Sequence, residues 1–195
     1  MNQQCIHAFQ RRGLFALLAL ALGAVLLAGC ATAPPKDPAE ILFERGKAHF
    51  RQGLLHENYA KEKEAESEFL EAIRLKPAFA EAYALLGCTD MELRKYDEGF
   101  LNLRKAIELK PDLAEAHNDL GVWLGFSGNL EEAIKEFRLA VRWNPDDPAA
   151  LKNLASALDH MGRRKEAREF WERALKVEKK PGEKKLIKKR LAEKD

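Results

Sequence analysis

Apolar residues recur at the intervals of amphipathic helices in two neighbouring stretches, residues 114–126 and 130–143. The tripeptide Ser-Gly-Asn at 127–129 separates the two stretches, and residues of these types favour turns. An Asn-Pro pair at 144–145 ends the second stretch, because proline disfavours helical geometry at the residue before it. The pattern therefore predicts two helices joined by a tight turn.

This helix pair is one unit of a repeat with a period of 34 residues. Pro77, Pro111 and Pro145 close three consecutive units at this spacing. Small residues recur at three further phases of the same period, which is typical of stacked helix pairs. These residues are Gly46, Ala65 and Ala72; Gly87, Gly99 and Ala106; Gly121, Ala133 and Ala140; and Ala155, Ala167 and Ala174. All twelve are Gly or Ala, so we predict an all-α solenoid of about four helix pairs.

The chain resembles the tetratricopeptide repeat at these small positions, over nearly all of the sequence after residue 38. A large residue stands at the same place in every unit, namely Phe69, Leu103, Phe137 and Trp171. The resemblance implies a right-handed superhelix with a concave groove that binds other proteins. It also implies a binding protein rather than an enzyme.

Unit one departs from the period, because Pro77 comes seven residues late. The insertion lies between Gly53 and Ala65, and seven residues correspond to about two helical turns. The run KEKEAESE favours helix, so we expect the second helix of this unit to start early and overhang the array. A longer loop is the alternative.

The N-terminal segment has the order of a bacterial lipoprotein signal. Arg11 and Arg12 precede an uncharged apolar run at 14–28, which is too short for an ordinary membrane-spanning helix. The run ends in Leu-Ala-Gly-Cys at 27–30, which resembles the lipobox. The resemblance implies cleavage before Cys30 and acylation of that cysteine with lipid such as palmitate. A plain secretory signal or an anchor helix with a chance cysteine is the alternative.

The residues after Cys30 suggest where the protein resides. Ala31 stands where an aspartate would, by resemblance to enterobacterial sorting, retain a lipoprotein in the inner membrane. We therefore expect the periplasmic face of the outer membrane. The proline-rich sequence that follows predicts an extended tether. The predicted domains are a signal at 1–29, a lipidated tether at 30–38, four repeat units at 39–79, 80–113, 114–147 and 148–181, and a basic capping helix and tail at 182–195.

Charge excludes one class of function and raises a question about the C-terminus. The chain holds 33 Lys and Arg against 31 Asp and Glu, and the two arginines of the leader account for the difference. A neutral mature chain argues against nucleic-acid binding. Residues 176–195 nevertheless hold nine bases and four acids. The cap lysines and Arg190 either meet an anionic lipid or acidic protein or form a solvated helix face.

Catalytic chemistry has no candidate in this sequence. Nucleotide-binding loops, zinc-protease motifs and nucleophile elbows are missing. His117 is expected to pack in the interior, Cys88 is expected to pack as a small apolar group, and His160 is expected at the surface. We predict no catalytic residue, no metal, no cofactor and no small-molecule substrate.

The predicted site is the groove that the first helices line. By resemblance, its residues are Phe43, Lys47, Phe50, Arg51, Ala84, Cys88, Met91, Asn118, Val122, Phe126, Lys152, Ser156 and Asp159. The middle of this set is apolar and its ends carry charge, which suits an extended peptide or a partner helix. Ordinary solenoid lining without a ligand is the alternative. Lys152 with Asn153 is only a fragment of the pattern that clamps peptide carboxylates.

These features together predict a lipid-anchored periplasmic scaffold that captures another envelope protein in its groove, for assembly, secretion or pilus biogenesis. The architecture resembles the pilotin lipoproteins of type IV pili and the repeat lipoproteins that gather peptidoglycan hydrolases. The alternative is a structural subunit of an envelope complex that docks through its overhanging first unit or an end face.

Overall fold

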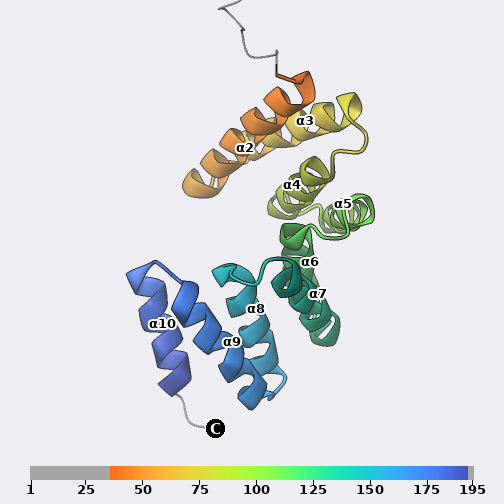
Figure 1. Cartoon of the computed structure of the whole chain (residues 1–195). Coiled ribbons are helices and arrows are strands. Elements are labelled where there is room, and N and C mark those ends of the chain that lie inside the picture. Colours follow the sequence, from red (N-terminus) through yellow and green to blue (C-terminus); the bar gives the residue numbers. More distant parts are fainter. Residues whose placement is uncertain (1–35, 193–195) are drawn as a thin grey trace, which may run out of the picture. The chain divides into compact units, whose positions relative to one another are not determined.

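The structure, a computed structural model, describes residues 36–192. Within these residues it contains nine helices and no strand (Figure 1). None of the described helices combines the length and the hydrophobicity that crossing a bilayer requires. The predicted signal at 1–29, Cys30 and most of the predicted tether lie outside the described residues, as do the last three residues of the basic tail.

Four consecutive helix pairs make up the repeats, and each pair packs against the next (Figure 1). The second helix of the last pair also packs against the C-terminal helix. The pairs are α2 (Pro38–His56) with α3 (Tyr59–Leu75), α4 (Ala80–Glu92) with α5 (Tyr96–Leu109), α6 (Ala114–Phe126) with α7 (Leu130–Trp143), and α8 (Pro148–His160) with α9 (Arg164–Val177), and α10 (Pro181–Ala192) follows. The limits predicted for α6 and α7 are confirmed.

The glycines of the first helices lie directly against large side chains of the second helices. A Cβ atom built on Gly121 would lie 2.6 Å from Cε1 of Phe137, and one built on Gly46 would lie 2.7 Å from Cε1 of Phe69. Carbon atoms in a packed core do not approach this closely. The recurrence of a small and a large residue in each unit therefore records a direct contact between paired helices.

The alanines of the repeat pattern occupy the tightest parts of the core. None of the eight has any solvent exposure. They are Ala65, Ala72, Ala106, Ala133, Ala140, Ala155, Ala167 and Ala174. Because each lies where helices approach closely, a larger side chain would force the helices apart.

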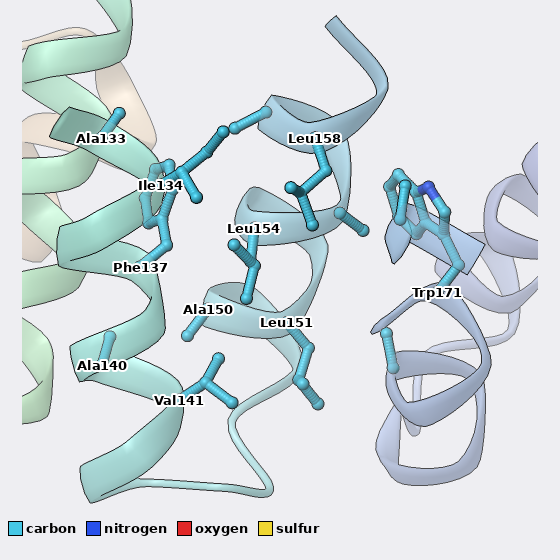
Figure 2. Close-up of a cluster of buried hydrophobic side chains, with 14 of the residues drawn as sticks. Ala133, Ile134, Phe137, Ala140, Val141, Ala150, Leu151, Leu154, Leu158 and Trp171 are labelled. Carbon is cyan, nitrogen blue, oxygen red and sulfur yellow. The ribbon is translucent and has the colours of Figure 1, made fainter. Parts of the chain in front are cut away.

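The largest core cluster joins the last two units. Helix α8 lies between α7 and α9, and its leucines fill the space between them (Figure 2). Leu154 and Leu158 are fully buried, and Trp171 of α9 closes the cluster with 9% exposure. Phe137 contributes a large ring from α7. Burial of side chains of this size stabilises the fold by about 1.5–3 kcal/mol each.

The turn within each of the last three units uses one left-handed residue at the same repeat position. Gly128 has φ 84° and Gly162 has φ 73°, whereas Arg94 adopts φ 60° at the equivalent place. Glycine adopts positive φ without steric cost, whereas an arginine with positive φ suffers a steric clash of its Cβ atom. Unit two therefore carries local backbone strain that units three and four avoid.

Unit one differs from the prediction in where its extra residues go. The first helix α2 has 19 residues against 13 in α4, while α3 has 17 against 14 in α5. The second helix does start early, but most of the insertion lengthens the first helix instead. The loop alternative is wrong. Gly53 allows the longer first helix to stay close to the second helix, since a Cβ atom there would lie 2.7 Å from Cγ of Glu62. This contact repeats that of Gly46 with Phe69 two turns further on.

The C-terminal helix begins at Pro181, one residue before the capping segment predicted at 182–195. Its Ile187 is 1% exposed and closes the end of the largest core cluster. Glu178, just before the helix, accepts hydrogen bonds from the backbone N–H groups of Lys179 and Lys180. The backbone N–H of Lys180 and the ammonium of Lys152 lower the pKa of Glu178 to about 2. This carboxylate therefore fixes the start of the capping helix.

Candidate partner-binding groove

The thirteen predicted groove residues all lie on the first helices of the four units. Helix α2 carries Phe43, Lys47, Phe50 and Arg51; α4 carries Ala84, Cys88 and Met91; α6 carries Asn118, Val122 and Phe126; and α8 carries Lys152, Ser156 and Asp159. Their exposure is uneven, since Ala84 is buried, Arg51 and Phe126 are exposed and the other ten are half-buried. Membership of the groove is therefore not enough to make a side chain available to a partner.

A chain of polar contacts crosses three consecutive first helices. The Cys88 thiol of α4 donates to Oδ2 of Asp119 on α6 at 3.0 Å. Asn118 donates to Oδ1 of the same carboxylate at 3.2 Å, and Asn153 of α8 donates to Oδ1 of Asn118 at 2.9 Å. These contacts bring two predicted groove residues together.

Asp119 and Asn153 are the members of this chain that were not predicted as groove residues. They occupy the same repeat position, 34 residues apart, next to the predicted positions Asn118 and Lys152. A polar residue recurring at one phase of the period is the signal that identifies them. These contacts link α4, α6 and α8 along the predicted groove, and among the described residues no buried side-chain nitrogen or oxygen lacks a hydrogen-bond partner.

The surroundings of Cys88 in this series of polar contacts disfavour the reactive thiolate form. Burial, followed by the nearby Asp119 carboxylate, raises the pKa of the Cys88 thiol well above its ordinary value. Burial also raises the pKa of Asp119. The thiol, unlike the thiolate, is a poor nucleophile. Cys88 thus acts as a hydrogen-bond donor, which goes beyond the small apolar packing role predicted for it.

Phe43, at the end of the groove formed by unit one, belongs to an aromatic cluster. Its ring centroid lies 4.7 Å from that of Phe79 and 5.9 Å from that of Phe69. The ammonium of Lys47 lies 5.2 Å from the Phe43 ring centroid and 2.9 Å from Oε1 of Glu44. The two ring contacts hold α2 against α3 and against the residue that precedes α4, so Phe43 has mainly a packing role.

At the other end of the predicted groove, the charged residues Lys152 and Asp159 already have partners within the protein. Lys152 Nζ lies 3.0 Å from Oε2 of Glu178 and 2.8 Å from Oε2 of Glu183. Asp159 accepts a hydrogen bond from the Trp171 indole at 2.8 Å. Since two carboxylates of the same chain already face Lys152, a peptide carboxylate would have to displace them. The geometry thus agrees with the sequence argument against carboxylate clamping.

Several exposed apolar side chains lie at or near the C-terminal ends of the first helices. Phe126, the last residue of α6, is 87% exposed, and Met91 is half-buried near the end of α4. Leu54 of α2 and Met161 at the end of α8 are also exposed, although they were not among the predicted site residues. Leu54 follows Phe50 by four residues, the spacing that places two side chains on one helix face.

The burial of two histidines outside the predicted groove residues was also predicted from the sequence. His117 is 4% exposed, as predicted, and its two ring nitrogens face Oε2 of Glu136 at 2.7 Å and the carbonyl of Pro111 at 3.0 Å. His160 is exposed, as predicted. Across residues 36–192, no group of three His, Cys, Asp or Glu is arranged to hold a metal ion.

Comparison with known proteins identifies the class. Solved structures of similar fold include one described as the crystal structure of MamA, which is 25% identical with a TM-score of 0.60 and covers 79% of this chain and 83% of its own. Another is MamA from Desulfovibrio magneticus RS-1, 20% identical with a TM-score of 0.58, covering 71% and 75%. The all-α solenoid of helix pairs predicted from the repeat is confirmed, and such a fold is typically a scaffold for protein interactions.

A third similar structure is the first repeat domain of Spaghetti (RPAP3) bound to the HSP90 peptide SRMEEVD. It is 20% identical with a TM-score of 0.57, and the match covers 64% of this chain and 94% of that one. Family models described as tetratricopeptide repeat match residues 127–183 and residues 80–113. These two segments are therefore similar to tetratricopeptide repeats. A search of curated proteins gives no match.

Proposed function

We propose that this protein is a lipid-anchored periplasmic scaffold that captures another envelope protein in the groove of its repeats. The groove half of the proposal is supported by the exposure of Phe126. A phenylalanine with 87% of its surface in water contributes little to folding, and it stands beside the half-buried Val122. An aromatic anchor of this kind is typical of binding hot spots.

The occupant that fits this surface is an amphipathic helix or an extended segment of the partner. Phe126, Met91 and Phe50 come from three successive first helices, so they offer apolar contacts at intervals along the groove. The polar chain through Asp119 and Asn118 holds the helices in place before the partner arrives. Pre-organisation of this kind lowers the entropy lost on binding.

The groove is tested with a photo-crosslinking amino acid at position 126 in living cells. We expect one envelope protein to be crosslinked, and the combined replacement of Phe50, Met91 and Phe126 by serine to abolish its capture. The matched control is Leu101 of α5, which is 65% exposed on a second helix. Crosslinks of equal yield and identity from positions 101 and 126 would contradict groove binding.

The anchoring half of the proposal is supported by the lipobox-like sequence that ends at Cys30. Because the cysteine thiolate is the group that accepts lipid, Cys30→Ser should leave an uncut precursor without acyl chains. Mass spectrometry of the intact protein measures both events. Cleavage before residue 30 in the serine variant would contradict lipoprotein processing and leave an ordinary secretory signal.

A second candidate function has its own structural support at the extended end of unit one. Leu54, Leu55 and Tyr59 lie around the turn between α2 and α3 and are 47%, 77% and 60% exposed. This cluster favours a subunit that docks through its overhanging hairpin. Crosslinking from position 55, with none from position 126, would support this alternative and exclude the groove.

A further inference from the structure

The capping helix α10 concentrates positive charge on its outer face. Helix α10 contains five Lys and Arg but only one acid, Glu183. That carboxylate lies 2.8 Å from Lys152 of α8, so it is already matched. Lys185 and Lys188 are exposed on α10. The outer face therefore carries a strong net positive charge.

Several lysines on the repeats differ from these in having acidic neighbours. Lys105 lies 2.9 Å from Glu108, and Lys110 lies 2.7 Å from Glu81. Among the residues that the structure describes, no carboxylate pairs with Lys185 or Lys188. Like charges crowded along one helix repel each other and reduce its stability. Lys189 and Arg190 lie in the last turn, where the helix dipole favours positive charge, but folding gives no such reason for Lys185 and Lys188.

An apolar side chain stands among these lysines. Ile187 faces the core and is 1% exposed, whereas its neighbour Leu186 is 59% exposed. Leu186 also borders a cavity of about 340 Å³ whose lining includes Trp171 and Lys189. Clustered lysines attract an anionic membrane surface by their charge, and an exposed leucine beside them adds an apolar contact.

We propose that the outer face of α10 docks on an anionic phospholipid bilayer. Lys185, Lys188 and Lys189 meet the headgroup phosphates, and Leu186 enters the apolar region beneath them. Lysine suits this role, because its ammonium is a point charge that accepts phosphates from many directions. A bilayer presents many phosphates at once, so it matches the whole cluster. This docking does not depend on the groove or on acylation of Cys30.

The test measures how fast individual lysines of the full chain are acetylated by a water-soluble reagent, with mass spectrometry as the readout. The chain is mixed either with phosphatidylcholine vesicles or with vesicles that also contain phosphatidylglycerol. We expect slower acetylation of Lys185 and Lys188 on the anionic vesicles alone. Lys135 of α7 and Lys165 of α9 are exposed internal controls and should react equally on both.

A pair of variants makes the test quantitative. Neutralising one lysine weakens binding to an anionic bilayer roughly fivefold, so Lys185→Gln with Lys188→Gln should raise the lipid concentration that half-protects Lys189 roughly 25-fold. The matched double variant, Lys135→Gln with Lys165→Gln, should leave that concentration unchanged. Circular dichroism confirms that both variants are folded.

Three outcomes would overturn the proposal. The first is equal acetylation of Lys185 on neutral and anionic vesicles. The second is protection that persists at high salt, since exposed charges are screened over about 3 Å at 1 M ionic strength. The third is protection by soluble poly-L-glutamate but not by anionic vesicles, which would assign the helix to an acidic protein instead.

Discussion

Replacing Gly121 by alanine tests the small-to-large contact on which the repeat is built. The new Cβ would lie 2.6 Å from Cε1 and 2.7 Å from Cδ1 of Phe137. The Phe137 ring is 4% exposed and belongs to the largest core cluster, so it has little room to move away. Either the ring leaves its preferred rotamer or helices α6 and α7 separate.

The expected magnitude is the difference between two opposing effects. Alanine favours a helix over glycine by about 1 kcal/mol. Overpacking of a core costs about 1–3 kcal/mol. Gly121→Ala should therefore destabilise the fold by up to about 2 kcal/mol. Gly125 lies on the same helix, and a Cβ atom added there would meet nothing within 4 Å, so Gly125→Ala should gain up to about 1 kcal/mol.

Thermal unfolding followed by circular dichroism measures the difference between the two variants. One kcal/mol shifts the melting temperature of a domain of this size by about 2–4 °C, so Gly121→Ala should melt roughly 2–12 °C below Gly125→Ala. Adding Phe137→Leu to Gly121→Ala should recover part of the loss, because the two sites are coupled. Equal melting temperatures for the two alanine variants would refute the contact.

Three further outcomes follow from individual residues. Burial alone would lower the pKa of His117, but hydrogen bonds to Glu136 and the Pro111 carbonyl raise it above 6.5. The stability it provides should be complete below that value and lost as the pH rises through the raised pKa; a melting temperature as high at pH 9 as at pH 5 would contradict this. Arg94→Gly should stabilise the fold by up to about 1 kcal/mol in urea unfolding, because it removes positive φ from arginine. Lys152→Met should speed amide hydrogen exchange in α10, because its Glu178 and Glu183 ion pairs are lost; unchanged exchange would show that the cap holds without them.

The sequence predicted the regular part of the fold well, for a physical reason. A period of small residues can persist only where helices meet closely at the same place in every unit, and the buried alanines show that they do. The limits of α6 and α7 followed from turn residues and a proline, which act locally. Local chemistry and a repeated contact can both be read without knowing the neighbours of each residue.

The chemistry of the groove could be predicted less well, because the repeat position of a residue does not reveal its partners. Lys152 occupies a groove position, but its charge is matched by Glu178 and Glu183, which follow it by 26 and 31 residues. Cys88 was expected to pack as an apolar group, yet it donates to Asp119 of the next unit. The Cys88 contact runs between two units and the Lys152 contacts run to the end of the array, and no local pattern signals either of them.

The two ends of the array show why departures from the period are informative. An internal first helix such as α6 contacts both neighbouring first helices, so its residues must satisfy two fixed surfaces. Within residues 36–192, helix α2 has such a neighbour on one side only, and it is six residues longer than α4 while Gly53 keeps the close approach to Glu62. Helix α10 likewise meets the repeats with one face, through Ile187, and its other face collected lysines. Constraint is therefore weakest at the two ends, and the residues found there are free to follow function rather than packing. For this reason crosslinking at position 55 and lysine labelling at position 185 probe surfaces that the repeat itself does not explain.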